Sequence, residues 1–421
     1  MRLVLLTGAV CAALAFSSPA SARIWDNTQI DDLLMEAERA PSEGLALPAA
    51  EMSTVAGLED LANLDARFEV QRDTAADALF RVLANDYAQG AVTPSNGDSS
   101  WLMAPPPGPD YAVLAAAIDA GAAPSWLLRS LLPQSVDYRA LRDELARLVR
   151  AGAGEREHIM RLRANMERWR WLPRTWPARR VEVRIAEFKL DFFQESLPTV
   201  THDIIVGRPR SPTHVFSALI ESVTLNPDWD PPDSIAYGEL LPRFRRNPRA
   251  AAAEGFQATD GAGQVVDPAS VDWSMRPFPY RIRQRPGAGN ALGVIRFNLP
   301  NPFAIYLHDT PSRNLFTRTN RALSHGCVRV KDPVQLGEEL FADPTWNASA
   351  LQSAIDTGVT QDIPLVNPVP VYFLYLTAIA QADGSVLYLD DIYHRDDPIV
   401  RALDRNPLAI AEEAHPAMCP S

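Results

Sequence analysis

The sequence predicts an α+β protein in which an α-helical scaffold domain precedes a β-rich domain. Up to about residue 172, apolar residues recur at a spacing near 3.6, which is typical of amphipathic helices. After Pro173 the spacing falls to two, which is typical of strands with one buried face. The chain has 421 residues, 47% of them hydrophobic, which suffices for two or three domains with a core in each.

The first 22 residues have the pattern of a secretory signal peptide. A basic residue precedes an apolar stretch that ends at Phe16, and the small residues Ala20-Ser21-Ala22 suit a cleavage site. A membrane anchor needs ~20 apolar residues, and the residues before Cys11 fit a lipoprotein cleavage box poorly. We therefore expect export without a membrane anchor, and a mature chain that begins at Arg23.

Charge and cysteine content exclude two classes of protein. The formal net charge of −12 argues against a nucleic-acid partner, because a duplex binder needs a large cationic surface. Only Cys327 and Cys419 follow the signal peptide, whereas a secreted disulfide scaffold carries many more cysteines. A single disulfide between these two cysteines remains the alternative to a reactive Cys327.

The helical part is predicted from 65 to 172. Residues 23–64 show only weak periodicity and are interpreted as a lead-in arm. Thr74 and Asp77 fit a capping box, which predicts a helix from there to Gly90, and a loop follows. The further apolar faces that predict helices lie at 111–120, 125–132, 138–149 and 159–169.

The β-rich part begins after Pro173. Its strand-like runs lie at 181–186, 201–206, 215–223, 294–299, 304–307 and 371–376. A Pro-rich segment with several aromatic residues and little strand pattern runs from Asn226 to Asn290. We interpret this segment as an insertion that could cover a site.

Two polar faces in the β-rich part point to thiol chemistry. Alternation along residues 304–308 places Tyr306 and His308 on one surface, and alternation after Gly326 places Cys327 with Arg329. If the two runs pair, an imidazole can take the proton of a thiol that otherwise titrates near ~8.5. Gly326 would permit a tight turn and leave the Cys327 amide free to stabilise an oxyanion.

Two structural roles and a zinc site are the alternatives to this hypothesis. A lone cysteine is most often a small buried apolar residue, and a lone histidine at a strand end is most often a structural group. His308, His325 and Cys327 could also supply three ligands to zinc, although their spacing matches no known zinc pattern.

The residues around Cys327 closely resemble the signature of the L,D-transpeptidases, the YkuD domain family. The resemblance rests on Tyr306-Leu307-His308-Asp309-Thr310-Pro311 and on Leu323-Ser324-His325-Gly326-Cys327-Val328-Arg329-Val330. Four other stretches resemble the long YcbB-type branch that carries an N-terminal scaffold: 165–173, 226–229, 285–287 and 290–293. The similarity spans roughly 65 to 397.

The resemblance implies a periplasmic enzyme that acts on peptidoglycan stem peptides without a metal or organic cofactor. The cysteine would attack a tetrapeptide donor beside its terminal D-Ala, expel D-Ala and form a thioester. The diaminopimelate amine of an acceptor stem would resolve it into a 3-3 cross-link, and carbapenems would inhibit the reaction. The implied roles are nucleophile for Cys327, general base and acid for His308, orienting backbone at Asp309, oxyanion site for Gly326 and Tyr306, and substrate binding for Ser324, His325, Arg329 and Trp229.

The implied domains are a signal peptide (1–22), the arm (23–64), the scaffold (65–172), a catalytic domain (173–397) and a tail (398–421). The insertion at about 226–290 would cap the cleft, with Trp229 and Tyr237 as candidate walls. Five basic residues and no acidic ones lie between 313 and 331, which suits a carboxylate-rich peptide.

One departure from the branch and two rival functions remain. The small peptidoglycan-binding module expected before residue 165 is missing, because only a few residues follow the helix that ends near Arg150. A hydrolase on the same site is one rival, since acceptor choice depends on how the cap excludes water. The other is a non-catalytic wall-binding scaffold protein with an inert Cys327, and the scaffold could also hold a protein partner that the sequence does not name.

Overall fold

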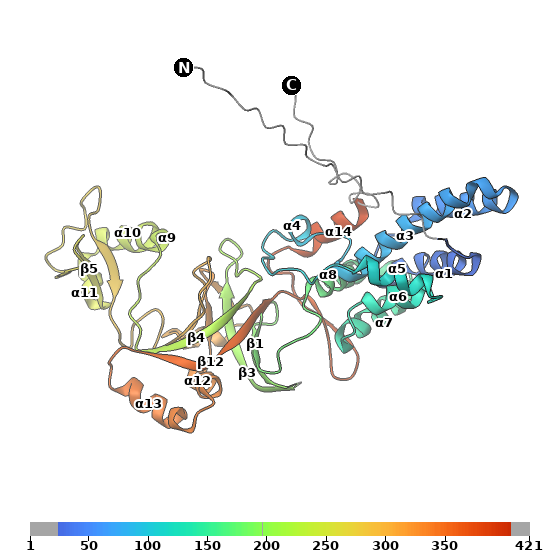
Figure 1. The fold of residues 1–421 in the computed structure, drawn as a ribbon. Coiled ribbons are helices and arrows are strands. Elements are labelled where there is room, and N and C mark those ends of the chain that lie inside the picture. The colour runs from blue at the N-terminus through green and yellow to red at the C-terminus, as the bar shows by residue number, and fades with distance from the viewer. Residues whose placement is uncertain (1–23, 196, 406–421) are drawn as a thin grey trace, which may run out of the picture. The chain divides into compact units, whose positions relative to one another are not determined.

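The computed structural model describes residues 24–195 and 197–405, which fold as two compact units. The predicted signal peptide, Cys11 and Cys419 lie outside the described residues. One unit holds residues up to 41 together with 47–85 and 109–131, and the other holds 42–46, 86–108 and the chain from 132 onward. Figure 1 shows the helices of the first half and the strands of the second. Among the described residues, no helix is long and apolar enough to cross a membrane.

The first unit is helical. Its helices are α1 (Asn27–Ala37), α2 (Ala49–Leu64), most of α3 (Glu69–Gln89), α5 (Tyr111–Asp119) and α6 (Pro124–Leu131). Asp26 begins α1 with a capping box, since its carboxylate accepts the Gln29 amide at 2.8 Å. Ile30 and Leu33 of α1 are fully buried. The arm expected at 23–64 is therefore largely helical, and its first helix belongs to the core.

Helix α3 begins earlier than the sequence predicts. It starts at Glu69, so Thr74 lies inside the helix and donates its hydroxyl to the Val70 carbonyl at 2.7 Å. The capping box at Thr74 is thus wrong, because this hydroxyl bonds back to the preceding turn. The predicted apolar face is confirmed, since Leu79 and Leu83 are buried.

The second unit contains α-helices as well as the strands. Beside the strands it holds α4 (Pro94–Gly97), α7 (Val136–Ala151), α8 (Arg156–Trp171), α12 (Pro333–Phe341), α13 (Ala348–Asp356) and α14 (Asp396–Arg405). Ser135 caps α7 by accepting the Tyr138 amide at 3.1 Å. This unit therefore begins well before the boundary expected at 172. Residues 398–405 of the predicted tail also form a packed helix, with Ile399 and Leu403 buried.

Nine strands of the second unit form one closed sheet. They are β1 (Arg180–Arg184), β2 (Lys189–Gln194), β3 (Leu197–Gly207), β4 (Ser217–Leu225), β8 (Ile295–Asn298), β9 (Leu307–His308), β10 (Ala322–Ser324), β11 (Val328–Val330) and β12 (Gln361–Leu374). Their order is β10-β3-β11-β9-β8-β4-β12-β1-β2, and β2 also pairs with β3, which closes the circuit. Figure 1 shows β1, β12 and β4 side by side. A separate ribbon pairs β13 (Ala378–Ala380) with β14 (Val386–Tyr388).

The strand predicted at 304–307 is reduced to Leu307–His308. Asn301 explains the difference, because its side chain accepts the amides of Phe303 and Ile305 and donates to the Ile305 carbonyl at 2.6 Å. These bonds turn the backbone into a loop, in which Ala304 has a left-handed φ of 52°. The burial pattern still holds, since Ile305 and Leu307 are both buried.

The insertion at about 226–290 folds into a small subdomain, called the cap below. It contains α9 (Asp233–Ile235), the π-helical turn η4 (Ala236–Leu240), α10 (Leu241–Arg246), α11 (Pro248–Ala253) and the sheet β6-β5-β7 (Val265–Val266, Phe256–Thr259 and Arg281–Gln284). Figure 1 shows α9, α10 and α11 grouped with β5. Phe244 and Trp273 centre a core of its own. The sequence predicted little strand here, and these short strands were missed.

Candidate active site

A pocket of about 390 Å³ lies where the cap meets the closed sheet. Cys327, His308 and Arg329 line it from the sheet, and Trp229 and Glu239 line it from the cap. The insertion therefore does cover the predicted site.

The turn before Cys327 is held by Ser324. Gly326 has a φ of 122°, a left-handed conformation that favours glycine. The Ser324 hydroxyl accepts the Gly326 amide at 3.1 Å and donates to the Cys327 carbonyl at 2.5 Å. Ser324 is buried, and its hydroxyl shapes the turn. The Gly326 amide, expected at the oxyanion site, is thus already bonded to a side chain.

Cys327 is a free, half-buried thiol at the head of β11. Its sulfur lies 3.5 Å from the carbonyl oxygen of Ala304. Burial raises the pKa of the Cys327 thiol above its usual range. The Cys327 thiol therefore keeps its proton at physiological pH.

His308 lines the same pocket as Cys327. Strand β11 pairs with β9 in parallel and sets His308 opposite Arg329. Nδ1 of His308 lies 2.5 Å from the Asp309 carbonyl oxygen, and a carbonyl only accepts, so Nδ1 carries the hydrogen. Burial, with the positive charge of Arg329 as the next cause, lowers the pKa of His308 to about 3. The ring is neutral at physiological pH, and Nε2 is its proton acceptor.

Asp309 fixes the loop that precedes β8. Its carboxylate accepts the Val294 amide at 3.0 Å and the Arg313 guanidinium at 3.1 Å. Gly293 has a φ of 64°, and a Cβ there would lie 2.3 Å from the Asp309 carboxylate. The loop thus needs a glycine at this position, which gives the stretch 290–293 a structural purpose.

Tyr306 and Arg329 flank the thiol and the imidazole. The rings of Tyr306 and His308 meet edge to face, with centroids 5.8 Å apart. Burial and the nearby Cys327 raise the pKa of Tyr306, so its phenol keeps a proton to donate. Burial lowers the pKa of Arg329, and its buried Nε has no partner in the described part of the chain.

Residues 178–344 match the family model of the L,D-transpeptidase catalytic domain, YkuD, and residues 17–145 match that of the Scaffold domain. The chain carries an L,D-transpeptidase catalytic domain. A Haemophilus influenzae protein provisionally named an L,D-transpeptidase is 37% identical over 219 residues, which are 52% of this chain and 44% of that protein. The match thus spans less than half the length of the curated relative.

Two solved structures align with 47% of this chain at low similarity. The Ldtfm–avibactam carbamoyl enzyme aligns over 49% of its chain at 11% identity and a TM-score of 0.23. Mycobacterium tuberculosis L,D-transpeptidase 1 aligns over 61% of its chain at 10% identity and a TM-score of 0.19. At these TM-scores the likenesses carry no weight for the fold or the mechanism.

The L,D-transpeptidase pocket includes a contact that the sequence did not reveal. Glu239 of η4 accepts a hydrogen bond from Nε2 of His325 at 2.8 Å and one from Arg208 at 3.1 Å. The side chain of His325 is therefore bonded to the cap. Trp229 lines the pocket as expected, whereas Tyr237 is 42% exposed and is not among the lining residues. No local sequence pattern predicts the contacts of Glu239, because its partners are far away in sequence.

The basic run at 313–331 does not converge on the pocket. Arg321 and Lys331 both pair with Asp203, and Arg313 pairs with Asp309. Of the run's basic residues only Arg329 lines the pocket. Within residues 24–195 and 197–405, no group of three or more His, Cys, Asp or Glu side chains could hold a metal ion.

Proposed function

We propose that this protein is a peptidoglycan L,D-transpeptidase that forms 3-3 cross-links through a Cys327 thioester. The observation that carries the proposal is the pocket that Cys327 and His308 both line, in which burial keeps the imidazole neutral with its hydrogen on Nδ1. The catalytic-domain match supplies the substrate class.

In the first step Cys327 attacks the carbonyl between the third stem residue and D-Ala. Nε2 of His308 takes the thiol proton, and the sulfur forms a bond to the carbonyl carbon. When the tetrahedral intermediate collapses, the C–N bond breaks and His308 returns the proton to the departing D-Ala amine. The product is a thioester on Cys327.

The developing oxyanion meets two donors in this proposal. The Cys327 amide is one, and the Tyr306 phenol, which stays protonated because burial raises its pKa, is the other. The Gly326 amide is left out because it already donates to Ser324.

In the second step the side-chain amine of an acceptor diaminopimelate attacks the thioester. His308 accepts the proton of the amine and returns it to the departing thiol, so the enzyme is regenerated. Arg329 binds a stem carboxylate, since its half-buried side chain lines the pocket and its Nε has no partner among the described residues. Trp229 and His325 border the donor site from the cap and the nucleophile turn.

Export to the periplasm belongs to the same proposal, because peptidoglycan lies outside the cytoplasm. Residues 1–22 serve as the signal, and cleavage after Ala22 leaves Arg23 as the first residue. N-terminal sequencing of the protein recovered from a periplasmic extract tests this, and an N-terminus at Met1 would contradict it.

Purified tetrapeptide muropeptides test the reaction itself. The wild-type protein should release D-Ala and yield 3-3 dimers, and Cys327→Ala should yield neither. Tripeptides without dimers would show that water is the acceptor and that the protein is a hydrolase. No D-Ala release from any muropeptide would favour a non-catalytic wall-binding protein.

A further inference from the structure

The carbonyl of Gly326, on the peptide bond that leads into Cys327, is held from outside the pocket. The Thr213 hydroxyl donates to the Gly326 carbonyl at 2.7 Å and accepts the Gly207 amide at 3.0 Å. Thr213 is fully buried. In a trans peptide the carbonyl and the following N–H point in opposite directions. A hydroxyl that fixes the Gly326 carbonyl therefore also fixes the direction of the Cys327 N–H.

Thr213 is itself held by the C-terminal part of the chain. The Tyr393 hydroxyl donates to the Gly207 carbonyl at 2.5 Å and accepts the Thr213 amide at 3.3 Å. Arg395 donates to the Thr213 carbonyl at 3.2 Å and lies over the Tyr393 ring, 4.6 Å from its centroid. The backbone around Ser211 packs so closely on Gly207 that a Cβ at position 207 would lie 2.2 Å from the Ser211 carbonyl oxygen, so the position needs a glycine.

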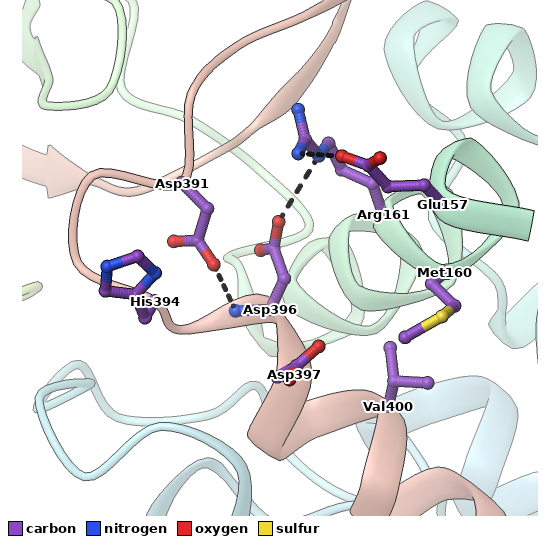
Figure 2. A pocket seen from close by; sticks show the side chains of 8 residues that line it. All are labelled: Glu157, Met160, Arg161, Asp391, His394, Asp396, Asp397 and Val400. Carbon is purple, nitrogen blue, oxygen red and sulfur yellow. Dashed lines mark hydrogen bonds and ion pairs between the residues drawn. The ribbon is translucent and has the colours of Figure 1, made fainter.

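Asp391 shapes the segment that carries Tyr393 and Arg395. Its carboxylate accepts the Tyr375 hydroxyl at 2.6 Å and the backbone amides of Arg395 and Asp396, both at 2.9 Å. Figure 2 shows Asp391 directed at the Asp396 amide, with Arg161 of α8 on the other side of Asp396. A cavity of about 320 Å³ lies here, on the side of the segment that faces α8.

We infer that Thr213, held in place by Tyr393 and Arg395, is a positioning residue that aims the Cys327 amide at the oxyanion. Within the described ranges the Cys327 N–H donates to no other residue, so its direction depends on the peptide that Thr213 holds. The inference rests on the proposed acyl transfer at Cys327. It assigns a function to the C-terminal segment that the nucleophile motif does not reveal.

Two reactions of Cys327 distinguish an effect on the direction of its N–H from an effect on the reactivity of its thiol. Acylation by meropenem develops an oxyanion, whereas alkylation by iodoacetamide needs only the thiol. Thr213→Val should slow acylation about 10- to 100-fold, because one oxyanion donor is worth ~10²–10³ in rate and is misaimed here. Alkylation should stay unchanged, and Thr213→Ser, which keeps the hydroxyl, should restore acylation.

The matched control is Thr224→Val, which removes another buried threonine hydroxyl, one that bonds Asp362 at 2.9 Å. It should leave both rates unchanged. Should Thr213→Val fail to fold, Tyr393→Phe takes its place, with a smaller loss of acylation of about 3- to 10-fold because Thr213 keeps its bond to Gly326.

Three results would overturn the inference. Unchanged acylation in Thr213→Val, or in Tyr393→Phe if that variant takes its place, contradicts it alone. An equal loss in both reactions would show that the thiol itself is disturbed. A wild-type protein that meropenem does not acylate, although iodoacetamide alkylates Cys327, would contradict the proposed function and the inference with it.

Discussion

Two buried polar regions of the second unit differ in how their charges are partnered. On α8, Glu167 accepts the Val92 amide at 2.6 Å and the Arg170 guanidinium at 2.8 Å. Arg170 also donates to the Tyr138 hydroxyl at 2.8 Å, and both charged side chains are fully buried. In the cysteine pocket, the His308 side chain is also buried, but the charge next to it is the positive Arg329 rather than a carboxylate.

The difference separates a structural network from a reactive one. In the α8 network each charge meets an opposite charge, so removing one leaves the other buried alone. In the pocket, burial keeps the imidazole and the thiol neutral, and Arg329 pairs with no carboxylate of the described residues. A substrate carboxylate would pair with Arg329, and a developing oxyanion would accept hydrogen bonds from the pocket. This is the pattern expected of a site that binds its transition state.

The largest expected effect is on the stability of the α8 network. Glu167→Ala should lower the free energy of unfolding by ~3–5 kcal/mol, because it strands the Arg170 charge. Urea unfolding measures this. Glu157→Ala is the control on the same helix, since its carboxylate is 84% exposed, and it should change stability by less than ~0.5 kcal/mol. Equal effects of the two substitutions would refute the network.

Arg329→Met should separate the two regions most clearly. It removes a charge that pairs with no carboxylate in residues 24–195 and 197–405, so stability should stay level or rise. The kcat/KM for the stem peptide should fall about 100-fold, or ~3 kcal/mol. The same change at Arg170 should destabilise the protein instead, because it strands Glu167. A strongly destabilised Arg329→Met protein would show that Arg329 has a structural partner.

The pH dependence of stability tests the environment of His308. An unfolded histidine titrates near ~6.5, and burial lowers the pKa of His308 to about 3. Between these values only the unfolded chain binds the proton, so stability falls as the pH falls, by about 2 kcal/mol from pH 6.5 to 5. His308→Asn should remove that part of the decline. Parallel pH profiles for wild type and variant would contradict a neutral, buried imidazole.

The smallest effect is expected at the contact between cap and nucleophile turn. The Glu239 carboxylate is 46% exposed, so Glu239→Gln should change acylation less than about fivefold, and added salt should reduce the difference. Glu254→Gln is the control, because its pairing with Arg243 lies within the cap. An effect of Glu254→Gln as large as that of Glu239→Gln would mean that the contact with His325 is not what matters.

Local patterns in the sequence predicted the elements whose residues alternate. Strand β1 was found because Val181 and Val183 are buried with polar residues between them. Strand β2 was missed because the alternation of Leu190, Asp191 and Phe192 lasts for only three residues before Phe193 ends it. Alternation over fewer than about four residues is too short to predict a strand.

The same limit applies to the site. Cys327 and His308 stand in a recognisable motif, and alternation placed each of them on a polar face. The sequence left open whether their two runs pair, and the structure shows that β9 pairs with β11. Glu239 and Thr213 act through contacts with residues 86 and 113 positions away, so nothing in their own neighbourhood predicts them. Asn301 likewise replaced part of a predicted strand with a loop through side-chain bonds.

The proposed function requires that Cys327 is an acylated nucleophile. Intact-mass measurement of the mature protein after incubation with meropenem tests it most directly, with Cys327→Ala as the control. One covalent adduct is expected on the wild-type protein and none on the variant. An unmodified wild-type protein, or an adduct of equal abundance on Cys327→Ala, would contradict it.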